Sequence, residues 1–406
     1  MPLRRTGVGT PLRHARCYVV VAMERRGGFQ ARSGASPLTE RADGRSLFSV
    51  YRKLDFGYQE GFRMLHRSQH RVTARHLATA ALVLSLGVWL GASKAQSIPP
   101  ASEPITVVAT VGMVADVVRA VGGACVQVTT LMGPGIDPHL YRASAGDVDR
   151  LRAAELIAYN GFNLEGQLGD VLGRLGQRIP TLALSERIAE GLASDERLLE
   201  GEDEYAGRTD PHLWGAADLW ARGIATVEAT LAELRPDCAD ALAERGAAFA
   251  NELAALHAWA RASAATVPEA FRTLVSSHDA FEYFGDAYGF AVAGIEGIST
   301  ESEASIADIR DTASLVLATG VPAIFIETTI SPRTIEAVQA AVRDRGGEVV
   351  IGGALFGDAM GDHDTPEGTY IGMMRHNVIT VVTALGGSPA AWPDTLADWA
   401  EAWNVR

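Results

Sequence analysis

The chain has 406 residues, which is long enough for two ordinary domains. Hydrophobic residues make up 47% of it, enough for a sizeable core. Its formal net charge of −13 is unevenly placed, because residues 1–95 contain 16 Lys and Arg against 5 Asp and Glu and the remainder is strongly acidic. Such an acidic surface argues against nucleic acid as a partner and is compatible with a cation.

The basic first part ends in the pattern of a secretory signal peptide. Arg71 and Arg75 precede an apolar run at 77–90, and small residues follow up to Ala95. The run has 14 residues, fewer than the roughly 20 of a membrane-spanning helix, so a membrane anchor or a buried helix is disfavoured. We expect residues 64–95 to be a signal peptide, cleaved after Ala95. The protein would then be periplasmic, without a lipid anchor because no Cys lies near that point.

The stretch before this signal is unusual, because signal peptides do not normally begin about 70 residues into a chain. Residues 1–63 are rich in Arg, Gly and Ser and show little periodicity, whereas Met64 would begin a signal of normal length. Residues 1–63 are therefore interpreted as a non-native or disordered extension that results from a mis-assigned start.

The exported part alternates short β-branched runs with helical patterns, which is typical of a parallel sheet in an α/β domain. Predicted helices include Met113–Val121 and one that begins with a capping box of Ser144 and Asp147. The predicted strands of the first set are Ile105–Thr110, Cys125–Met132, Leu156–Gly161 and Pro180–Ser185.

A second set follows after a long helical stretch, with predicted helices at Ser305–Ala318 and Pro332–Arg345. Its predicted strands are Thr273–Ser277, Phe290–Ile298, Ala323–Thr328 and Glu348–Gly353. The predicted fold class is therefore α/β, with two lobes that each contain a roughly four-stranded parallel sheet flanked by helices. We expect the N-terminal lobe at 96–235 and the C-terminal lobe at 269–406.

Residues 236–268, between the two sets, are rich in Ala, Leu and Glu and predict one long linking helix. Pro236 and Asp237 are helix-start residues, and Pro268 stops the pattern. About 28 helical residues would form a rod of roughly 42 Å. A rigid helix is thus expected to join the lobes, with a ligand site in the cleft between them.

Two cysteines, Cys125 and Cys238, remain after the predicted cleavage. They could pair in an oxidising compartment, but sequence does not place their Cα atoms within disulfide reach. A disulfide and two unpaired thiols both stay open.

The tetrapeptide Asp-Pro-His-Leu occurs twice, and it carries His139 and His212. Proline fixes φ, so each His is held on a stiff loop, and the Asp could accept a hydrogen bond from the loop backbone or the imidazole. His278 directly follows a predicted strand, where open α/β sheets bind ligands. Three such imidazoles predict a site for zinc or another first-row metal.

The other histidines are better explained without a metal. His257 is expected to be solvated in the middle of the long helix, His376 to be structural, and His363 to lie on a solvated loop. A carboxylate would complete a set of four ligands after the last strand. Asp358, Asp362 and Asp364 all qualify, and composition does not choose among them.

Several segments resemble, in order, the zinc/manganese solute-binding proteins of ABC importers, especially the TroA-like receptors. The similarity runs from about Ile105 to the C-terminus and is far more specific than a single motif. The segments are "DPHLYRASAGDVDRLRAAELIAYNGFNLEG", "DPHLW", "LVSSHDAFEYFGDAYGFAVAGIEGISTESEAS", "AIFIETTISPRTIEAV", "LFGDAMG" and "GTYIGMMRHN".

The resemblance implies a metal between two lobes, with one ligand from each matching segment. The ligands would be His139, His212, His278 and Asp358, where manganese-type members often carry Glu in place of the third His. The bound ion would be Zn²⁺ or Mn²⁺, one per chain, delivered to an ABC membrane permease by a monomeric protein. Many zinc-specific members have a His-rich loop before the second ligand, whereas Glu186–Asp210 contains nine acidic residues and no His.

Three alternatives remain at this stage. A zinc-dependent hydrolase needs an open coordination position and a general base, for which Glu282 and Glu327 are the nearby candidates. A binding protein for an organic ligand or a metal chelate would need an aromatic or basic cleft. A surface adhesin is disfavoured by the acidic body and the lack of a Cys for a lipid anchor.

Overall fold

The computed structural model describes residues 103–192, 198–201 and 207–405, and these belong to one compact unit. The predicted extension 1–63 and the predicted signal peptide 64–95 lie outside the described residues, as do parts of the acidic segment Glu186–Asp210. Among the described helices, none combines the length and the hydropathy that crossing a membrane requires.

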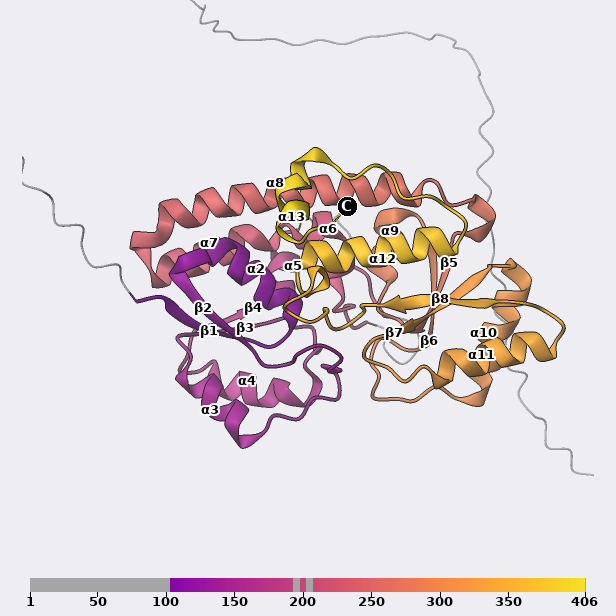
Figure 1. Ribbon diagram of the computed structural model, residues 1–406. Helices are drawn as coiled ribbons and strands as arrows, with labels where there is room; N and C mark the ends of the chain where they lie inside the picture. Colours follow the sequence, from indigo (N-terminus) through magenta and orange to yellow (C-terminus); the bar gives the residue numbers. More distant parts are fainter. Residues whose placement is uncertain (1–102, 193–197, 202–206, 406) are drawn as a thin grey trace, which may run out of the picture. The chain divides into compact units, whose positions relative to one another are not determined.

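The N-terminal half, residues 103–235, is built on a parallel four-stranded sheet with the order β2-β1-β3-β4. Figure 1 shows α2 and α7 on one side of this sheet and α3 and α4 on the other. The four predicted strands are confirmed, each slightly shorter than its apolar run. The bounds are β1 (Ile105–Ala109), β2 (Val126–Thr130), β3 (Leu156–Tyr159) and β4 (Thr181–Ala183).

The helices of this half follow the predicted pattern, including the capping box in which Ser144 and Asp147 exchange side-chain hydrogen bonds at the start of α3. The bounds are α2 (Gly112–Gly122), α3 (Ala145–Ala153), α4 (Gly169–Leu175), α5 (Leu184–Glu190), α6 (Ala217–Trp220) and α7 (Gly223–Leu234). The short 3₁₀ turns are η1 (Gly123–Cys125), η2 (Gly166–Leu168) and η4 (Leu213–Gly215).

The C-terminal half, residues 269–405, also contains the four predicted parallel strands, but they form two separate pairs, β5-β6 and β7-β8. The expectation of one four-stranded ladder here was therefore wrong in detail, although β5 lies beside β7. At the end of β5, the backbone N–H of His278 donates to the side chain of Glu327, the last residue of β7. The bounds are β5 (Thr273–His278), β6 (Ala291–Glu296), β7 (Ala323–Glu327) and β8 (Val350–Leu355).

Helices cover these strands on both sides, with α9 and α12 on one side and α10 and α11 on the other (Figure 1). Ser305 and Asp308 form a second capping box at the start of α10. The bounds are α9 (Glu282–Tyr288), α10 (Ile306–Thr319), α11 (Arg333–Asp344), α12 (Tyr370–Ala384) and α13 (Ala397–Ala402), with η6 (Glu269–Phe271), η7 (Pro366–Gly368) and η8 (Asp394–Leu396).

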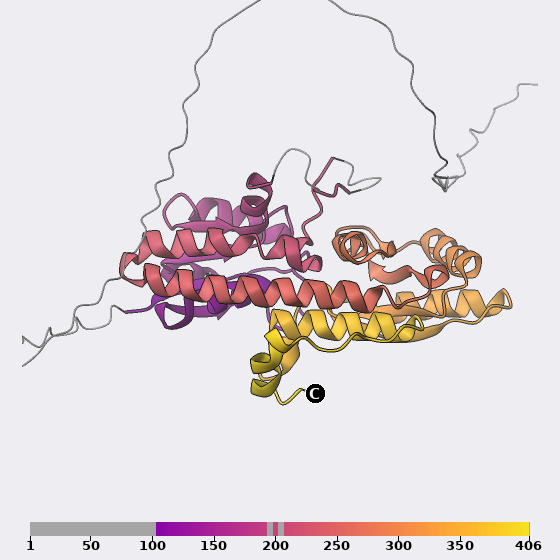
Figure 2. The ribbon, with the colours of Figure 1, turned by 90° about the horizontal axis from the view of Figure 1, so that it is seen from above.

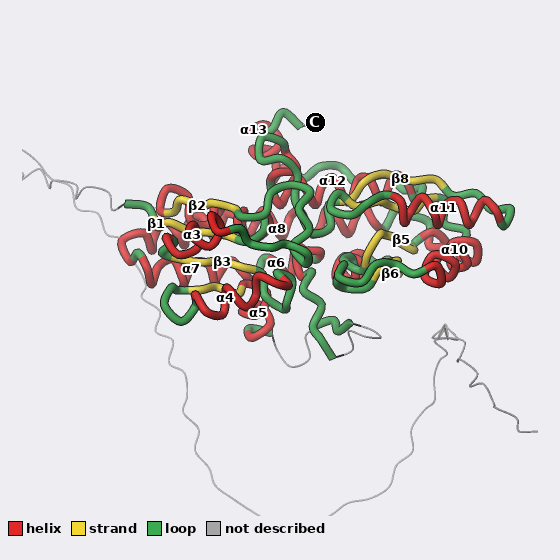
Figure 3. Tube along the Cα trace, turned by 90° about the horizontal axis from the view of Figure 1, so that it is seen from below, coloured by secondary structure: helices red, strands yellow, loops and turns green. Residues whose placement is uncertain are grey.

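The predicted long helix is present as α8 (Ala239–Ala264), 26 residues preceded by the 3₁₀ turn η5 (Pro236–Cys238). It packs against α2, α6 and α7 of the N-terminal half and against α9 and α12 of the C-terminal half (Figures 2 and 3). One cluster of buried hydrophobic residues, from Ile105 to Leu396, includes residues of α8 and of both halves. The hydrophobic core is therefore continuous from one half through α8 to the other.

Cys125 and Cys238 form a disulfide with their Cα atoms 6.4 Å apart, which resolves a question that the sequence left open. The bond joins the end of η1, just before β2, to the end of η5, just before α8. It therefore ties the start of the long helix to the edge strand of the N-terminal sheet.

Candidate metal centre

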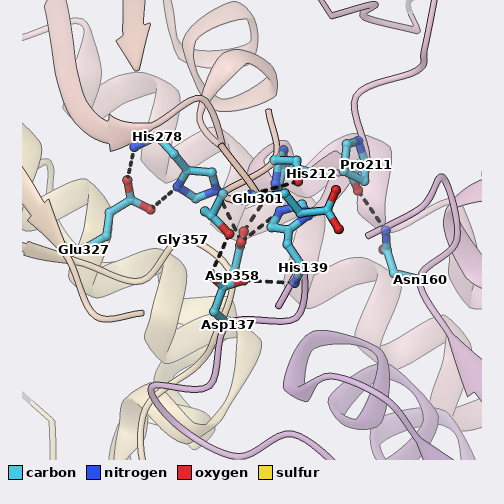
Figure 4. A network of polar contacts seen from close by, with 12 residues as sticks. Asp137, His139, Asn160, Pro211, His212, His278, Glu301, Glu327, Gly357 and Asp358 are labelled. Atoms are coloured by element: carbon cyan, nitrogen blue, oxygen red, sulfur yellow. Dashed lines mark hydrogen bonds and ion pairs between the residues drawn. The ribbon is translucent and has the colours of Figure 1, made fainter. Parts of the chain in front are cut away.

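Four predicted side chains, His139, His212, His278 and Asp358, converge from four separate segments of the chain (Figure 4). His139 lies on the loop after β2, and His212 immediately precedes η4. His278 is the last residue of β5, and Asp358 follows β8. One ligand atom from each of the four lies within 4.8 Å of the others.

The Asp358 carboxylate occupies the middle of the cluster. Its Oδ2 lies 3.2 Å from Nε2 of both His139 and His278, and its Oδ1 lies 3.3 Å from Nε2 of His212. All four side chains are at most 2% exposed, and these three nitrogens and two oxygens make no hydrogen bond of good geometry. Since burying polar atoms without partners is costly, the cluster has the composition and placement of a cation site.

The two Asp-Pro-His copies have the same local structure, which explains the repeat. In each copy the Asp Oδ1 accepts the backbone N–H of the His two residues later, at 2.9 Å for Asp137 and 2.8 Å for Asp210. With the proline between them, this Asx turn gives each His loop a defined shape.

The two Asp residues differ in their second contact. Asp210 also lies 2.7 Å from Nδ1 of His212, so it orients that ring and leaves Nε2 directed at Asp358. Asp137 instead uses its Oδ2 to accept the hydroxyl of Thr300, at 2.6 Å, from a loop of the C-terminal half.

Glu327 holds His278 at two points. Its Oε1 accepts the backbone N–H at 2.8 Å, and its Oε2 lies 2.8 Å from Nδ1 of the ring. The sequence suggested Glu327 only as a possible base for hydrolysis. Its position at the end of β7, next to the end of β5, was the available indication that it could reach His278.

The charges of the cluster shift its proton equilibria. Burial by itself would lower the pKa of His212, but Asp210 and Asp358 outweigh it and raise that pKa from 6.5 to about 9. Burial is likewise outweighed at His278, where Glu327 and Asp358 raise the pKa well above its usual value. Burial disfavours the charged form of Asp358, yet the positive charges of His278 and His212 hold its pKa well below the usual range.

Three imidazole nitrogens and one carboxylate are a usual ligand set for zinc, and binding through both carboxylate oxygens would raise the coordination number to five. Each imidazole must be neutral to bind a metal. The carboxylates at Nδ1 of His212 and His278 favour the tautomer that leaves Nε2 free to bind, which is the arrangement that metal-binding histidines commonly use.

The remaining histidines lie away from the cluster. His363 is 87% exposed, which agrees with the sequence interpretation, and Asp362 and Asp364 on the same loop are also exposed. His376 is structural as expected, because its Nε2 lies 2.9 Å from the carbonyl oxygen of Ala354.

His257 differs from its prediction. Its side chain is only 17% exposed and lies 3.3 Å from Asp218, because α8 packs against other helices along this stretch instead of standing free in solvent.

Comparison with known proteins gives one family match, over residues 107–384, to a family described as the periplasmic component A of the zinc-uptake complex. The zinc-binding protein TroA of Treponema pallidum is 43% identical over 309 residues, which cover 75% of this chain and 97% of TroA. The manganese-binding lipoprotein MntA of Bacillus subtilis is 40% identical over 286 residues, 70% of this chain and 91% of MntA.

Solved structures agree with these relatives. The periplasmic zinc-binding protein TroA from Treponema pallidum superimposes with a TM-score of 0.65 at 42% identity, covering 70% of this chain and 99% of that one. The Fe(III)-bound YtgA from Chlamydia trachomatis has a TM-score of 0.63 at 26% identity, with 71% and 100% covered. Proteins of the same fold are therefore described with different metals.

Proposed function

This chain belongs to the family of periplasmic zinc-uptake components, and from that premise we propose that it captures Zn²⁺ or Mn²⁺ outside the cytoplasm and delivers the ion to the membrane permease of an ABC importer. Members of the family are substrate-binding components of metal importers and not enzymes. The metal is therefore cargo, bound and released without chemical change.

We propose His139, His212, His278 and Asp358 as the four ligands. The observation that carries this assignment is the convergence of three ring nitrogens on one carboxylate, all buried and all without good hydrogen bonds. The hydrolase alternative is weakened at the same place, because Glu327, one of its two candidate bases, contacts both the backbone and the ring of His278.

The preference between the two metals is left to measurement. An N₃O set of ligands gives Zn²⁺ the higher intrinsic affinity, so uptake of Mn²⁺ would depend on geometry and on metal availability. The relatives are named for both ions, since MntA is a manganese-binding and TroA a zinc-binding protein.

Titration of metal-stripped residues 96–406 with Mn²⁺, followed by heat release, tests the proposal, with Zn²⁺ as a control on the same preparation. Submicromolar binding of Mn²⁺ would identify a manganese or dual-metal receptor. Tight Zn²⁺ binding with negligible Mn²⁺ binding would identify a zinc receptor. Failure of both ions to bind would contradict the proposed function.

Alanine substitution of the four ligands tests the site. We expect His139→Ala, His212→Ala, His278→Ala and Asp358→Ala each to weaken metal binding by more than about 100-fold, since even outer partners of metal ligands contribute about 10–100-fold. The exposed His363 offers the matched control, and His363→Ala should bind like the wild type. A ligand variant with unchanged affinity would remove that residue from the site.

We further propose the organisation expected from the sequence: a cleaved signal peptide at 64–95, an N-terminal lobe at 96–235, a linking helix at 236–268 and a C-terminal lobe at 269–406. The protein is expected to act as a monomer without a nucleic-acid partner. Gel filtration of the metal-bound form with light scattering measures its mass, and a stable dimer would contradict this expectation.

Processing and anchoring need their own test, because several relatives are named lipoproteins. We propose cleavage after Ala95 and release into the periplasm, since no Cys lies next to that residue to accept a lipid. Mass spectrometry of the native protein should give an N-terminus at Gln96, whereas peptides from 27–63 or a lipid adduct would overturn the proposal.

A further inference from the structure

The segment 160–166, directly after β3, has a backbone conformation that few residues adopt. Gly161, Phe162, Asn163 and Gly166 all have positive φ, at 91°, 49°, 63° and 41°. For the two non-glycine residues this costs free energy, and such conformations persist where the surrounding structure holds them, often beside functional sites.

A buried carboxylate holds the segment. Glu165 is 2% exposed and accepts hydrogen bonds from the hydroxyl of Thr110 at 2.8 Å and from the backbone N–H groups of Asn160 and Gly161 at 2.7 and 3.2 Å. Thr110 follows β1, so the segment is fastened to the ends of the two central strands of the N-terminal sheet.

From this anchor the segment reaches the second Asp-Pro-His loop. The amide Nδ2 of Asn160, which is fully buried, donates to the carbonyl oxygen of Pro211 at 2.9 Å (Figure 4). Pro211 directly precedes His212. The opposite atom of the same amide, Oδ1, accepts the hydroxyl of Ser185 at 2.7 Å, so the amide is fixed from both sides.

The other end of the segment touches the first Asp-Pro-His loop. A Cβ placed on Gly166 would lie 2.3 Å from the backbone oxygen of His139, much closer than real Cβ atoms come to other atoms. Glycine at this position therefore lets the two backbones approach each other. The segment thus contacts both ligand loops of the N-terminal half.

We propose that residues 160–166 are a positioning element that sets the spacing of His139 and His212, and through it the affinity and the metal preference of the site. The element acts through the backbone of the two loops, and its own side chains do not bind the metal. The inference rests on the proposed function, because it assumes that these two histidines are ligands.

The Asn160→Ala variant tests the contact to the second loop, with Ser185→Ala as its matched control. Ser185→Ala removes only the hydrogen bond at Oδ1 of this amide, whereas Asn160→Ala removes the whole amide with its bonds to Ser185, Gly161 and Pro211. Both substitutions should lower the melting temperature of the metal-free protein, Asn160→Ala more than Ser185→Ala. Only Asn160→Ala loses the bond to Pro211. We expect it to weaken Zn²⁺ binding by roughly 10-fold or more, as outer partners of ligands do, and Ser185→Ala to leave the affinity unchanged.

The Gly166→Ala variant tests the contact to the first loop independently, in case Asn160→Ala does not fold. Its added methyl group must displace the backbone of His139. Gly173→Ala is the control, because Gly173 lies within α4 and its Cβ would meet no atom within 4 Å. Gly166→Ala should weaken Zn²⁺ binding, whereas Gly173→Ala should bind like the wild type.

Bound Co²⁺ reports the geometry, since its visible absorption depends on the arrangement of the ligands. We expect altered Co²⁺ spectra and altered ratios of Zn²⁺ to Mn²⁺ affinity for Asn160→Ala and Gly166→Ala, but not for their controls. Wild-type spectra and ratios in both variants would overturn the positioning role and leave the proposed function intact. A wild-type protein that binds none of the three metals would overturn the proposed function, and this inference with it.

Discussion

Three imidazole rings at the candidate centre direct Nε2 at one carboxylate, and two of these rings have a second carboxylate at Nδ1. The rings of His212 and His278 are thereby held between an inner and an outer acidic group. The inner group is shared, since Asp358 serves all three histidines. The outer groups, Asp210 and Glu327, are specific to His212 and His278, and they favour the tautomer that leaves Nε2 directed at Asp358.

Metal affinity should rise with pH up to about pH 9. The pKa of His212 is raised from 6.5 to about 9 in the folded metal-free protein. The bound proton therefore stabilises the folded state, fully at pH values below 6.5, and this stabilisation is lost as the pH rises through about 9. A metal must displace this proton, because a ligand imidazole is neutral. The sequence alone predicts weakening only below about pH 6, and the buried carboxylates move the dependence upward.

Competition with a chelator of known proton affinity, from pH 5.5 to 9, measures this dependence. An affinity that stopped rising near pH 7 would show that His212 has an ordinary pKa in solution.

The Glu327→Gln variant should weaken metal binding by roughly 10–100-fold, the usual effect of removing an outer partner of a metal ligand. The amide can still accept the N–H of His278, but it lacks the charge that favours the required tautomer at Nδ1. Isothermal titration with Zn²⁺ checks this. Glu336→Gln, at an exposed position on α11, controls for the loss of one acidic group, and equal affinity in the two variants would exclude a role for Glu327.

At the scale of elements, two of the proposed ligands lie at or just beyond the carboxyl ends of parallel strands. His278 ends β5, and Asp358 follows β8, in keeping with the rule that open α/β sheets bind ligands beyond the carboxyl ends of their strands. The disulfide lies at the other end of the N-terminal sheet, before the start of β2. It is therefore at the opposite end of β2 from the loop that carries His139.

Removal of the disulfide should lower stability without changing affinity. The bond closes a loop with a sequence separation of 113 residues, and disulfides across long loops contribute roughly 2–5 kcal/mol. A Cys125→Ser, Cys238→Ser double variant should melt at a lower temperature and bind metal at 25 °C like the wild type. The reduced wild-type protein should behave in the same way, and weaker metal binding in both would show that the bond also supports the centre.

At the scale of the whole described unit, hydrogen bonds cross between the halves directly beside the proposed ligands. Asp137, the first residue of the first Asp-Pro-His copy, accepts from the hydroxyl of Thr300 of the C-terminal half. Trp214, two residues after His212, donates its indole N–H to the carbonyl oxygen of Gly357, the neighbour of Asp358, at 3.0 Å. Any separation of the two halves at the centre must break these bonds.

Release of the metal should therefore be faster when the Thr300 contact is lost. Thr300→Val keeps the shape of the side chain and removes its hydroxyl, whereas Thr300→Ser keeps the hydroxyl and serves as the control. A hydrogen bond to a charged group contributes about 1.5–3 kcal/mol, and part of this energy opposes the separation of the halves that releases the metal. We therefore expect Thr300→Val to release metal several-fold faster than the wild type. Stopped-flow trapping with a chelator measures the rate, and equal rates in the two variants would contradict the expectation.

The amino-acid sequence by itself determined the alternation of strands and helices, the long helix and, among the four converging residues, the three histidines. These features depend on local periodicity, on proline and capping residues, and on motifs that repeat or match a known family, as the capping box at Ser144 and the two Asp-Pro-His copies show. Asp358 is the exception among the four, because only the family resemblance separated it from Asp362 and Asp364.

Only the tertiary structure decided what holds these residues in place. The pairing of Cys125 with Cys238, the contact of Glu327 with His278, and the support of His212 by Asn160 each join residues that lie 49 or more positions apart. No local pattern encodes such contacts, because they depend on how packed elements meet. The same packing splits the C-terminal strands into two pairs and leaves the side chain of His257 only 17% exposed. It also places carboxylates beside His212 and His278, which raises the pKa of both.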